Sequence, residues 1–234
     1  MRISQKTAVL VVVFNAAFFF YLADAPKAEE NALSSSTTKS LSSPSEDALL
    51  VKATRPKPFG EGPFKIFNVY TDAGSKENHY SPTGMMGDTW DIAIDERSAM
   101  RPHGGSTCIK VVYSKKASLG ARWAGVYWQD PNSNWGAIPG GYNLTGAKRL
   151  TFWARGEKGD EKIAQFKVGG MSAQYGDSDS SAISGEILST NWQKFSIDLE
   201  GKDLSVITGG FCFTVNLDSN PEGVTFYLDD IQFE

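Results

Sequence analysis

Two adjacent acidic residues stand in the segment that ends the chain. In residues 224–234, apolar and polar side chains alternate on either side of Asp229 and Asp230, as they do in a β-strand. Carboxylates are the ligands that hard cations such as calcium prefer, and calcium takes about six to eight oxygen ligands. The pair therefore has two interpretations: a charged strand end in solvent, or one part of a calcium site whose other ligands come from elsewhere.

A second group of acids raises the question of catalysis. Hydrolysis of a glycosidic bond needs two carboxyl groups across a groove. The segment Asp91-Ile-Ala-Ile-Asp95-Glu96 is similar to the strand of laminarinase-type hydrolases that carries three acids at alternate positions, but Ala93 stands at the middle one. The sequence also lacks a G-x-S-x-G motif. We therefore expect no catalytic residues, and a β-sandwich glycoside hydrolase or polysaccharide lyase is the alternative.

Composition excludes several other classes of protein. The chain has 234 residues, a formal net charge of −4 and a pI near 5.3, whereas nucleic-acid binding favours clustered Lys and Arg. It has two His and no C-x-x-C spacing, so a centre built from His and Cys is not expected. Its hydrophobic content of 41% is sufficient for a packed core.

The N-terminus has the pattern of a targeting segment. Arg2 and Lys6 precede an uncharged, apolar stretch over residues 7–23, which is typical of a secretory signal. We expect residues 1–25 to be a signal peptide or a retained signal anchor, and the protein to be periplasmic, extracellular or on the cell surface. Residues 26–58 are rich in Ser, Thr and Pro without periodicity, which predicts a disordered linker.

Residues 59–234 predict one β-rich domain. Short alternating runs are separated by turn residues, which is typical of a sandwich or barrel. The expected strands are 65–70, 90–95, 107–114, 122–129, 150–155, 162–168, 185–188, 192–199, 210–217 and 224–233.

Four of these segments resemble a known family. The segments are a small-residue turn followed by Ile-Lys-Val-Val-Tyr113, then Leu150-Thr-Phe-Trp-Ala-Arg-Gly156, then Trp192-Gln-Lys-Phe-Ser-Ile197, and finally the closing strand. They are similar, in the same order, to motifs of galactose-binding-like jelly-roll carbohydrate-binding modules. The resemblance implies an all-β jelly-roll β-sandwich of two antiparallel sheets. It also implies non-catalytic binding of a polysaccharide or oligosaccharide, with a cell-surface interaction domain that binds no sugar as a further alternative.

A jelly roll assigns strands to sheets and side chains to faces. One sheet would hold residues 107–114, 224–233, 150–155 and 192–199, and the other 122–129, 210–217, 162–168 and 185–188. In the second sheet, alternation turns one set of side chains away from the core: Trp123, Tyr127, Gln129, Cys212, Thr214, Asn216, Gln165 and Lys167. Trp123 and Tyr127 would stack on sugar rings, while the amide, hydroxyl and ammonium groups would form hydrogen bonds. With the faces reversed, the two aromatics would instead be core residues.

Trp135, the acidic residues and the two cysteines carry three further expectations. Trp135 lies in a turn-rich loop, where it would either close the end of the sandwich or stack on a ligand. The resemblance implies a structural calcium with Asp229 as a ligand, and Asp72, Asp88 and Asp95 are the candidate partners. Cys108 and Cys212 fall on different sheets, so we expect two free thiols although exported chains favour disulfides.

Overall fold

The computed structural model describes residues 57–58 and 63–234. Within them the chain forms thirteen strands and no helix, so the expected all-β fold is confirmed. None of the described segments is a helix of the length and apolarity that crossing a membrane requires. The expected signal segment 1–25, and all of the 26–58 linker except its last two residues, lie outside the described residues.

The first sheet has five antiparallel strands in the order β10–β9–β12–β6–β3. Their bounds are β10 Ser180–Leu188, β9 Glu161–Gly169, β12 Gly209–Asn216, β6 Trp123–Gln129 and β3 Ser81–Gly87.

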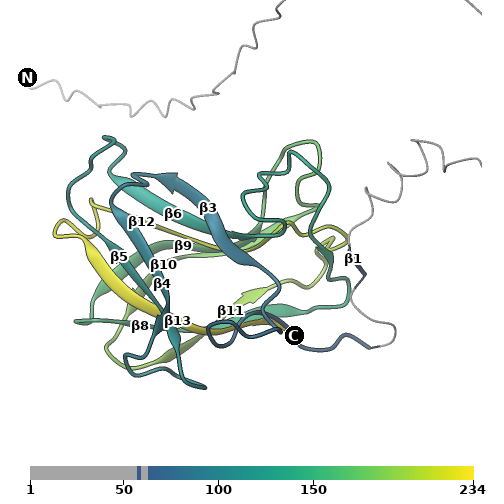
Figure 1. The fold of residues 1–234 in the computed structure, drawn as a ribbon, viewed down its shortest axis with the longest axis horizontal. Helices are drawn as coiled ribbons and strands as arrows, with labels where there is room; N and C mark the ends of the chain where they lie inside the picture. Colours follow the sequence, from purple (N-terminus) through teal and green to yellow (C-terminus); the bar gives the residue numbers. More distant parts are fainter. Residues whose placement is uncertain (1–56, 59–62) are drawn as a thin grey trace, which may run out of the picture. The chain divides into compact units, whose positions relative to one another are not determined.

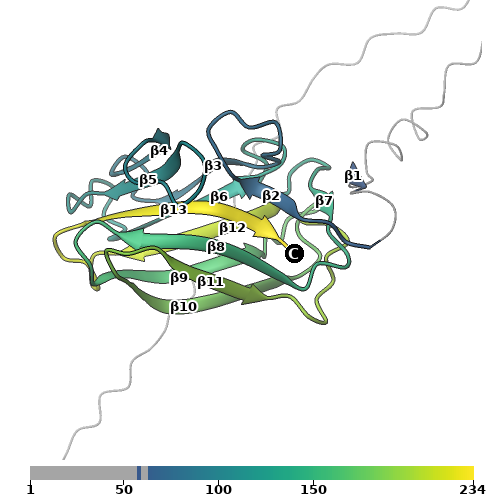
Figure 2. The ribbon, with the colours of Figure 1, turned by 90° about the horizontal axis from the view of Figure 1, so that it is seen from below.

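The second sheet has the order β11–β8–β13–β5–β4, with β2 also paired to β13. Their bounds are β11 Gln193–Asp198, β8 Arg149–Gly156, β13 Val224–Phe233, β5 Cys108–Tyr113, β4 Ile92–Ser98 and β2 Phe67–Tyr70. Two short strands, β1 Lys57–Pro58 and β7 Tyr142–Asn143, form a separate parallel pair. The predicted division of eight strands between two sheets is confirmed, and so is the jelly-roll sandwich. Figure 1 shows the two layers, and Figure 2 shows β13, in yellow, running beside β8.

Aromatic rings from both sheets meet in the core. Phe211 of β12 lies 5.1 Å from Phe152 of β8 between ring centroids, and Phe213 of β12 meets Phe226 of β13 edge-on at 5.0 Å. Trp128 of β6 is fully buried against both phenylalanines of β12. Burial of these rings and the aliphatic residues around them is the main force that holds the layers together.

The sequence did not predict β3, which forms one edge of the five-stranded sheet. Its sequence, Ser-Pro-Thr-Gly-Met-Met-Gly, is poor in strand-forming residues. Pro82 is tolerated because an edge strand has a row of N–H groups without a partner strand. A Cβ at Gly84 would lie 2.8 Å from the Cβ of Tyr127, so glycine permits this strand to approach β6.

Replacing Phe152 with alanine tests the core. Its ring lies within 5.5 Å, between centroids, of the rings of Phe166, Phe195 and Phe211. We expect Phe152→Ala to lower the free energy of unfolding by about 3–5 kcal/mol, through lost burial and the cavity left behind. Urea denaturation followed by tryptophan fluorescence measures this loss. Ile66→Ala, at an exposed position, is the control and should change stability little; a similar loss in both variants would contradict this account of the core.

Candidate functional site

The orientation of β6 decides which of its side chains leave the core. Ala124, Val126 and Trp128 are completely buried between the sheets. Because successive side chains of a strand point to opposite faces, Trp123 and Tyr127 lie on the other side. That side of the five-stranded sheet, away from the core, is called the outer face below.

Trp123 lies at one end of the outer face and is 39% exposed. A Cβ at Gly87 of β3 would come within 3.0 Å of its ring, so glycine leaves the indole room beside the strand. Next along β6, Gly125 has no side chain, and a Cβ there would lie 2.8 Å from Met86 Cε and 2.9 Å from Thr214 Cγ2. The methionine and threonine therefore cover the gap between the two aromatic positions of β6.

Tyr127 lies on the outer face but is not an exposed platform, because it is only 7% exposed. Its hydroxyl donates a hydrogen bond of 3.0 Å to the Gly169 carbonyl, and its ring packs with Met171 and Cys212. Burial raises the pKa of the phenol above its usual value, so the hydroxyl stays protonated and remains a donor. The expectation of an open stacking surface at Tyr127 is thus corrected: a loop of the same domain covers it.

Trp135 stands over the covered tyrosine and is 40% exposed. Its ring meets that of Tyr127 edge-on at 6.0 Å between centroids. The two rings share an open pocket of about 480 Å³ with Met86 and residues 170–173. Trp135 was expected either to close the end of the sandwich or to stack on a ligand. Its exposed position at this pocket fits stacking on a ligand better.

Hydrogen bonds fix the loop that carries Trp135. Asn134 Oδ1 accepts hydrogen bonds from the N–H groups of Gly136 and Ile138, and its Nδ2 donates to the Ile138 carbonyl. The Gly136 carbonyl in turn accepts from the N–H of Tyr175, which joins this loop to the next one over the pocket. The indole is therefore held at the rim by main-chain contacts on both sides.

The second loop of the pocket, residues 170–177, is held by Asp177. One carboxylate oxygen accepts the N–H of Met171 at 2.8 Å, and the other accepts those of Thr208 and Gly209 at 2.5 and 2.9 Å. Burial raises the pKa of this carboxyl above its usual value, while the main-chain donors act in the opposite direction. The loop that covers Tyr127 is thus tied to the start of β12.

Gln129 does not fit the surface role expected for it. It is completely buried, and its amide Nε2 lies 3.9 Å from the sulfur of Met171. Its Oε1 has no hydrogen-bond partner among the described residues. The side chain lies against Gly84 of β3 and Met171 of the 170–177 loop, which leave none of it exposed on the outer face.

Four polar side chains expected on the outer face are half-buried there: Thr214 and Asn216 of β12, and Gln165 and Lys167 of β9. Thr214 pairs in register with Gln165, and Lys167 pairs with Cys212, so the strip next to β6 is continuous. Asn216 has another task, because its Oδ1 accepts the N–H of Ser219 at 2.8 Å in the turn after β12. The structure therefore brings Thr214, Gln165 and Lys167 together beside the aromatic residues, and engages Asn216 in a turn.

Two methionines, Met86 and Met171, belong to the site although the sequence did not predict them there. Met86 covers Gly125 on the outer face, and Met171 covers Tyr127 and lines the pocket. Recognition of β3 as a neighbour of β6 would have placed Met86 on this face. For Met171, which follows Gly169-Gly170 in a loop, the sequence carries no comparable signal.

The acids expected to bind calcium hold a turn directly. Asp229 Oδ2 accepts N–H groups of His103 and Gly104 at 2.8 and 3.3 Å, and Asp72 Oδ1 accepts those of Ser106 and Thr107, both at 2.8 Å. The donors of Asp72 hold the pKa of that carboxyl below its usual value.

Of the other two candidate ligands, Asp88 is buried in the turn between β3 and β4, and Asp95 lies on β4. Asp95 is exposed on β4 and accepts the N–H of Arg97. Among the described residues, no three Asp, Glu, His or Cys side chains come together so that they could hold a metal ion. Calcium binding through Asp229, Asp72 and Asp95 stays a prediction.

The two cysteines are separate, buried thiols on different sheets. Burial raises the pKa of Cys108 to about 11 and that of Cys212 to about 12, so neither is a reactive thiolate near neutral pH. Cys212 packs against Tyr127 beneath the pocket, and Cys108 lies on β5 against the carbonyl of Ser98.

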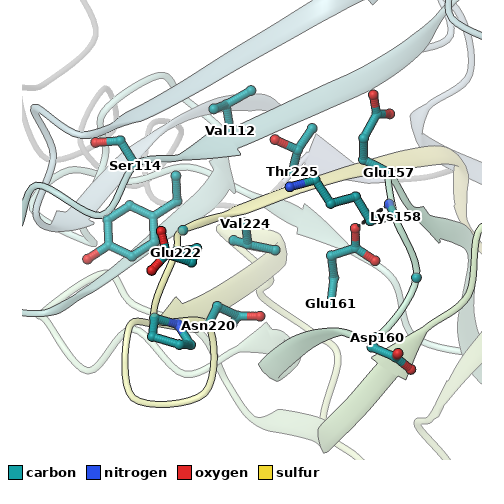
Figure 3. Close-up of a pocket in the computed structure, with 14 residues that line it drawn as sticks. Val112, Ser114, Glu157, Lys158, Asp160, Glu161, Asn220, Glu222, Val224 and Thr225 are labelled. Atoms are coloured by element: carbon teal, nitrogen blue, oxygen red, sulfur yellow. Dashed lines mark hydrogen bonds between the residues drawn. The ribbon is translucent and has the colours of Figure 1, made fainter.

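A second hollow of about 340 Å³ lies between the β8–β9 and β12–β13 turns (Figure 3). Three of its carboxylates accept hydrogen bonds from neighbouring residues. Glu157 accepts from the Tyr227 hydroxyl, Glu161 from the N–H of Lys158 and Glu222 from the Lys115 ammonium. The hydrogen bond and charge of Lys115 lower the pKa of Glu222, whereas a general acid needs a raised one. The three carboxylates of this hollow are thus engaged by neighbouring residues of the domain.

Comparison with known proteins finds similar solved structures only. No family model matches the sequence, and no curated protein matches it. A family 30 carbohydrate-binding module has a TM-score of 0.44 and 15% identity, over 73% of this chain and 98% of that one.

Two further carbohydrate-binding modules are similar to the same degree. The family 11 module of Clostridium thermocellum, in complex with a β-1,3-1,4-mixed-linked tetrasaccharide, has a TM-score of 0.42 and 15% identity over 66% of this chain and 85% of that one. The xylan-binding family 22 domain of Paenibacillus barcinonensis has a TM-score of 0.39 and 10% identity over 73% and 92%. The structures found are of the kind that the sequence motifs resemble, while the assignment of a site rests on this chain's own side chains.

The raised pKa of Asp229 gives a pH dependence of stability. Burial, followed by the charge of Asp230, raises this pKa to about 6. In the unfolded chain an Asp has a pKa of about 3.9, so Asp229 binds its proton more tightly in the native state than in the unfolded state. The contribution of Asp229 to stability is complete below the unfolded value and is lost as the pH rises through the folded value.

We therefore expect Asp229 to make the native protein more stable at about pH 5 than at about pH 7. Thermal unfolding of the protein and of Asp229→Asn over this range measures the effect. The variant, which has no titrating carboxyl at position 229, should show a smaller change in Tm between the two conditions, whatever its absolute Tm. Equal changes in both proteins would contradict the assignment to Asp229.

Proposed function

We propose that this protein binds a neutral polysaccharide or oligosaccharide on its outer face and does not cleave it. The observation that carries this proposal is the placement of two half-exposed indoles, Trp123 and Trp135, along one polar strip. Tyr127 lies four residue steps of extended strand beyond Trp123, a separation of about 13 Å, and Trp135 stands over Tyr127. The two indoles thus lie near opposite ends of β6.

The chemistry of the strip suits a sugar. The C–H faces of sugar rings are apolar and flat, so they stack on indole rings, while the hydroxyl groups need polar partners. Thr214, Gln165 and Lys167 supply a hydroxyl, an amide and an ammonium group between and beside the indoles. A ligand that combines apolar ring faces with many hydroxyl groups satisfies both kinds of side chain at once.

The same strip lacks the groups that sugar cleavage needs. The positions of β6, β12 and β9 expected on the outer face carry aromatic, amide, hydroxyl, thiol and ammonium groups, and none is Asp or Glu. A glycosidase needs two carboxyl groups beside the scissile bond. These positions therefore favour binding over hydrolysis. Export through residues 1–25 and a structural calcium remain predictions that accompany this proposal.

Replacing Trp123 with alanine tests the proposed function. We expect Trp123→Ala to weaken retention of the full-length protein at least about tenfold, because a stacking surface is lost. Native electrophoresis through gels containing hydroxyethylcellulose, glucomannan, mixed-linkage β-glucan or xylan measures this retention. Trp123→Phe, which keeps a smaller ring, should recover part of the binding, and Ile66→Ala should leave it unchanged.

Three results would overturn the proposal. The first is unchanged retention of Trp123→Ala on every gel that retains the unmodified protein, and the second is no retention of the unmodified protein on any gel. The third is the release of reducing ends or unsaturated products from the same polysaccharides by the purified protein, which would establish a hydrolase or a lyase instead.

A further inference from the structure

Trp90 is the most exposed of the large apolar side chains that the structure describes, at 78%. It lies in the tight turn between β3 and β4, where the N–H of Asp91 bonds the carbonyl of Asp88. Leu119, in the loop between β5 and β6, is 47% exposed. An indole held in water to this extent makes little contribution to the core, so its position calls for another explanation.

Asp88 fixes both of these loops. It is completely buried, and its Oδ1 accepts N–H groups of Leu119 and Ala121 at 3.2 and 3.0 Å. Its Oδ2 accepts the N–H of Arg122 at 2.8 Å and the hydroxyl of Tyr113 at 2.9 Å. One carboxylate thus joins the turn that carries Trp90 to the loop that carries Leu119.

Asp91 makes a second connection between the same loops. One of its oxygens accepts the N–H of Ser118 at 2.6 Å, and the other accepts the Ser118 hydroxyl at 2.8 Å. Trp90 is therefore flanked by two aspartates that both bind the neighbouring loop. A main chain fixed in this way presents its side chains with little further loss of entropy on binding.

The turn adjoins the Trp123 end of the outer face. The N–H of Asp88 donates a hydrogen bond of 2.8 Å to the carbonyl of Trp123, and Gly87, next to Asp88, lies against the indole of Trp123. Trp90 follows two residues after Asp88. The turn that carries the exposed indole thus begins directly beside the Trp123 end of β6.

Charge around the turn favours a neutral occupant. Two of the three basic side chains in residues 114–122 are paired with acids of the β12–β13 turn: Lys115 with Glu222 at 2.6 Å and Arg122 with Asp218 at 2.8 Å. These pairs cancel the positive field that an anionic membrane would need. The neighbours of Trp90 in the sequence, Thr89 and Asp91, are polar, whereas the centre of a protein interface is mostly apolar.

We propose that Trp90, supported by Leu119, forms an additional binding position for the same neutral polysaccharide, beyond the Trp123 end of the outer face. This inference rests on the proposed function, because it extends a ligand bound at Trp123. It implies that a long chain contacts Trp90 as well as Trp123, while a short oligosaccharide centred on the outer face does not. Affinity should therefore rise with chain length, through a contribution that requires the indole of Trp90.

The experiment compares Trp90→Ala with the unmodified full-length protein. Affinities are measured by calorimetry for hydroxyethylcellulose, glucomannan, mixed-linkage β-glucan and xylan, and for the oligosaccharides of each from the disaccharide upward. We expect Trp90→Ala to bind the polysaccharide about tenfold more weakly, which corresponds to about 1.4 kcal/mol, and to bind the shortest recognised oligosaccharide as the unmodified protein does. Trp90→Phe should recover part of the loss, and an unchanged Tm verifies the fold.

The outcomes separate this inference from the proposed function. If Trp123→Ala loses binding while Trp90→Ala matches the unmodified protein at every chain length, the inference is wrong and the proposed function stands. If none of the polysaccharides binds the unmodified protein, both are wrong. Binding to vesicles that contain phosphatidylserine is measured for the unmodified protein and for Trp90→Ala. If the variant loses vesicle binding while its polysaccharide binding is unchanged, the inference is overturned in favour of a membrane contact.

Discussion

The two-residue period of β6 is the constraint on which the candidate site depends. Trp128 lies in the core against Phe211 and Phe213, and the pairing of β6 with β12 on one side and β3 on the other prevents it from slipping. A slip of one residue would exchange the two faces of the strand and carry Trp123 into the sandwich. The packing of one buried indole therefore fixes the exposure of another, and the proposed binding surface is a consequence of the core.

Aspartates hold the loops around this framework. Asp88, Asp177 and Asp229 each accept three main-chain N–H groups, and Asp72 accepts two. Burying a carboxylate is costly, and charge-assisted hydrogen bonds to main-chain donors offset that cost. Oxygens engaged in this way stabilise loops. Asp72 and Asp229, which were expected to bind calcium, are among the acids engaged in this way.

Sequence patterns predicted the strands in which apolar and polar residues alternate. Alternation located most strands and, with the family motifs, assigned eight of them to the correct sheets. It missed β3, because Pro82, Gly84 and Gly87 hide the period of an edge strand that forms beside β6. The propensity of a segment is a weak guide where packing against a neighbour decides its conformation.

The sequence by itself determined which residues of β6 share a side of the sheet, because alternation is a property of the extended backbone. It left open which of the two sides faces the core, and the burial of Ala124, Val126 and Trp128 decided that. Tertiary structure alone decided how deep those residues lie. Tyr127 and Gln129 share a side with Trp123, but a loop more than forty residues further along the chain covers them, and Asp177 holds that loop in place. Exposure depends on contacts between distant segments, and no local period of the sequence encodes those contacts.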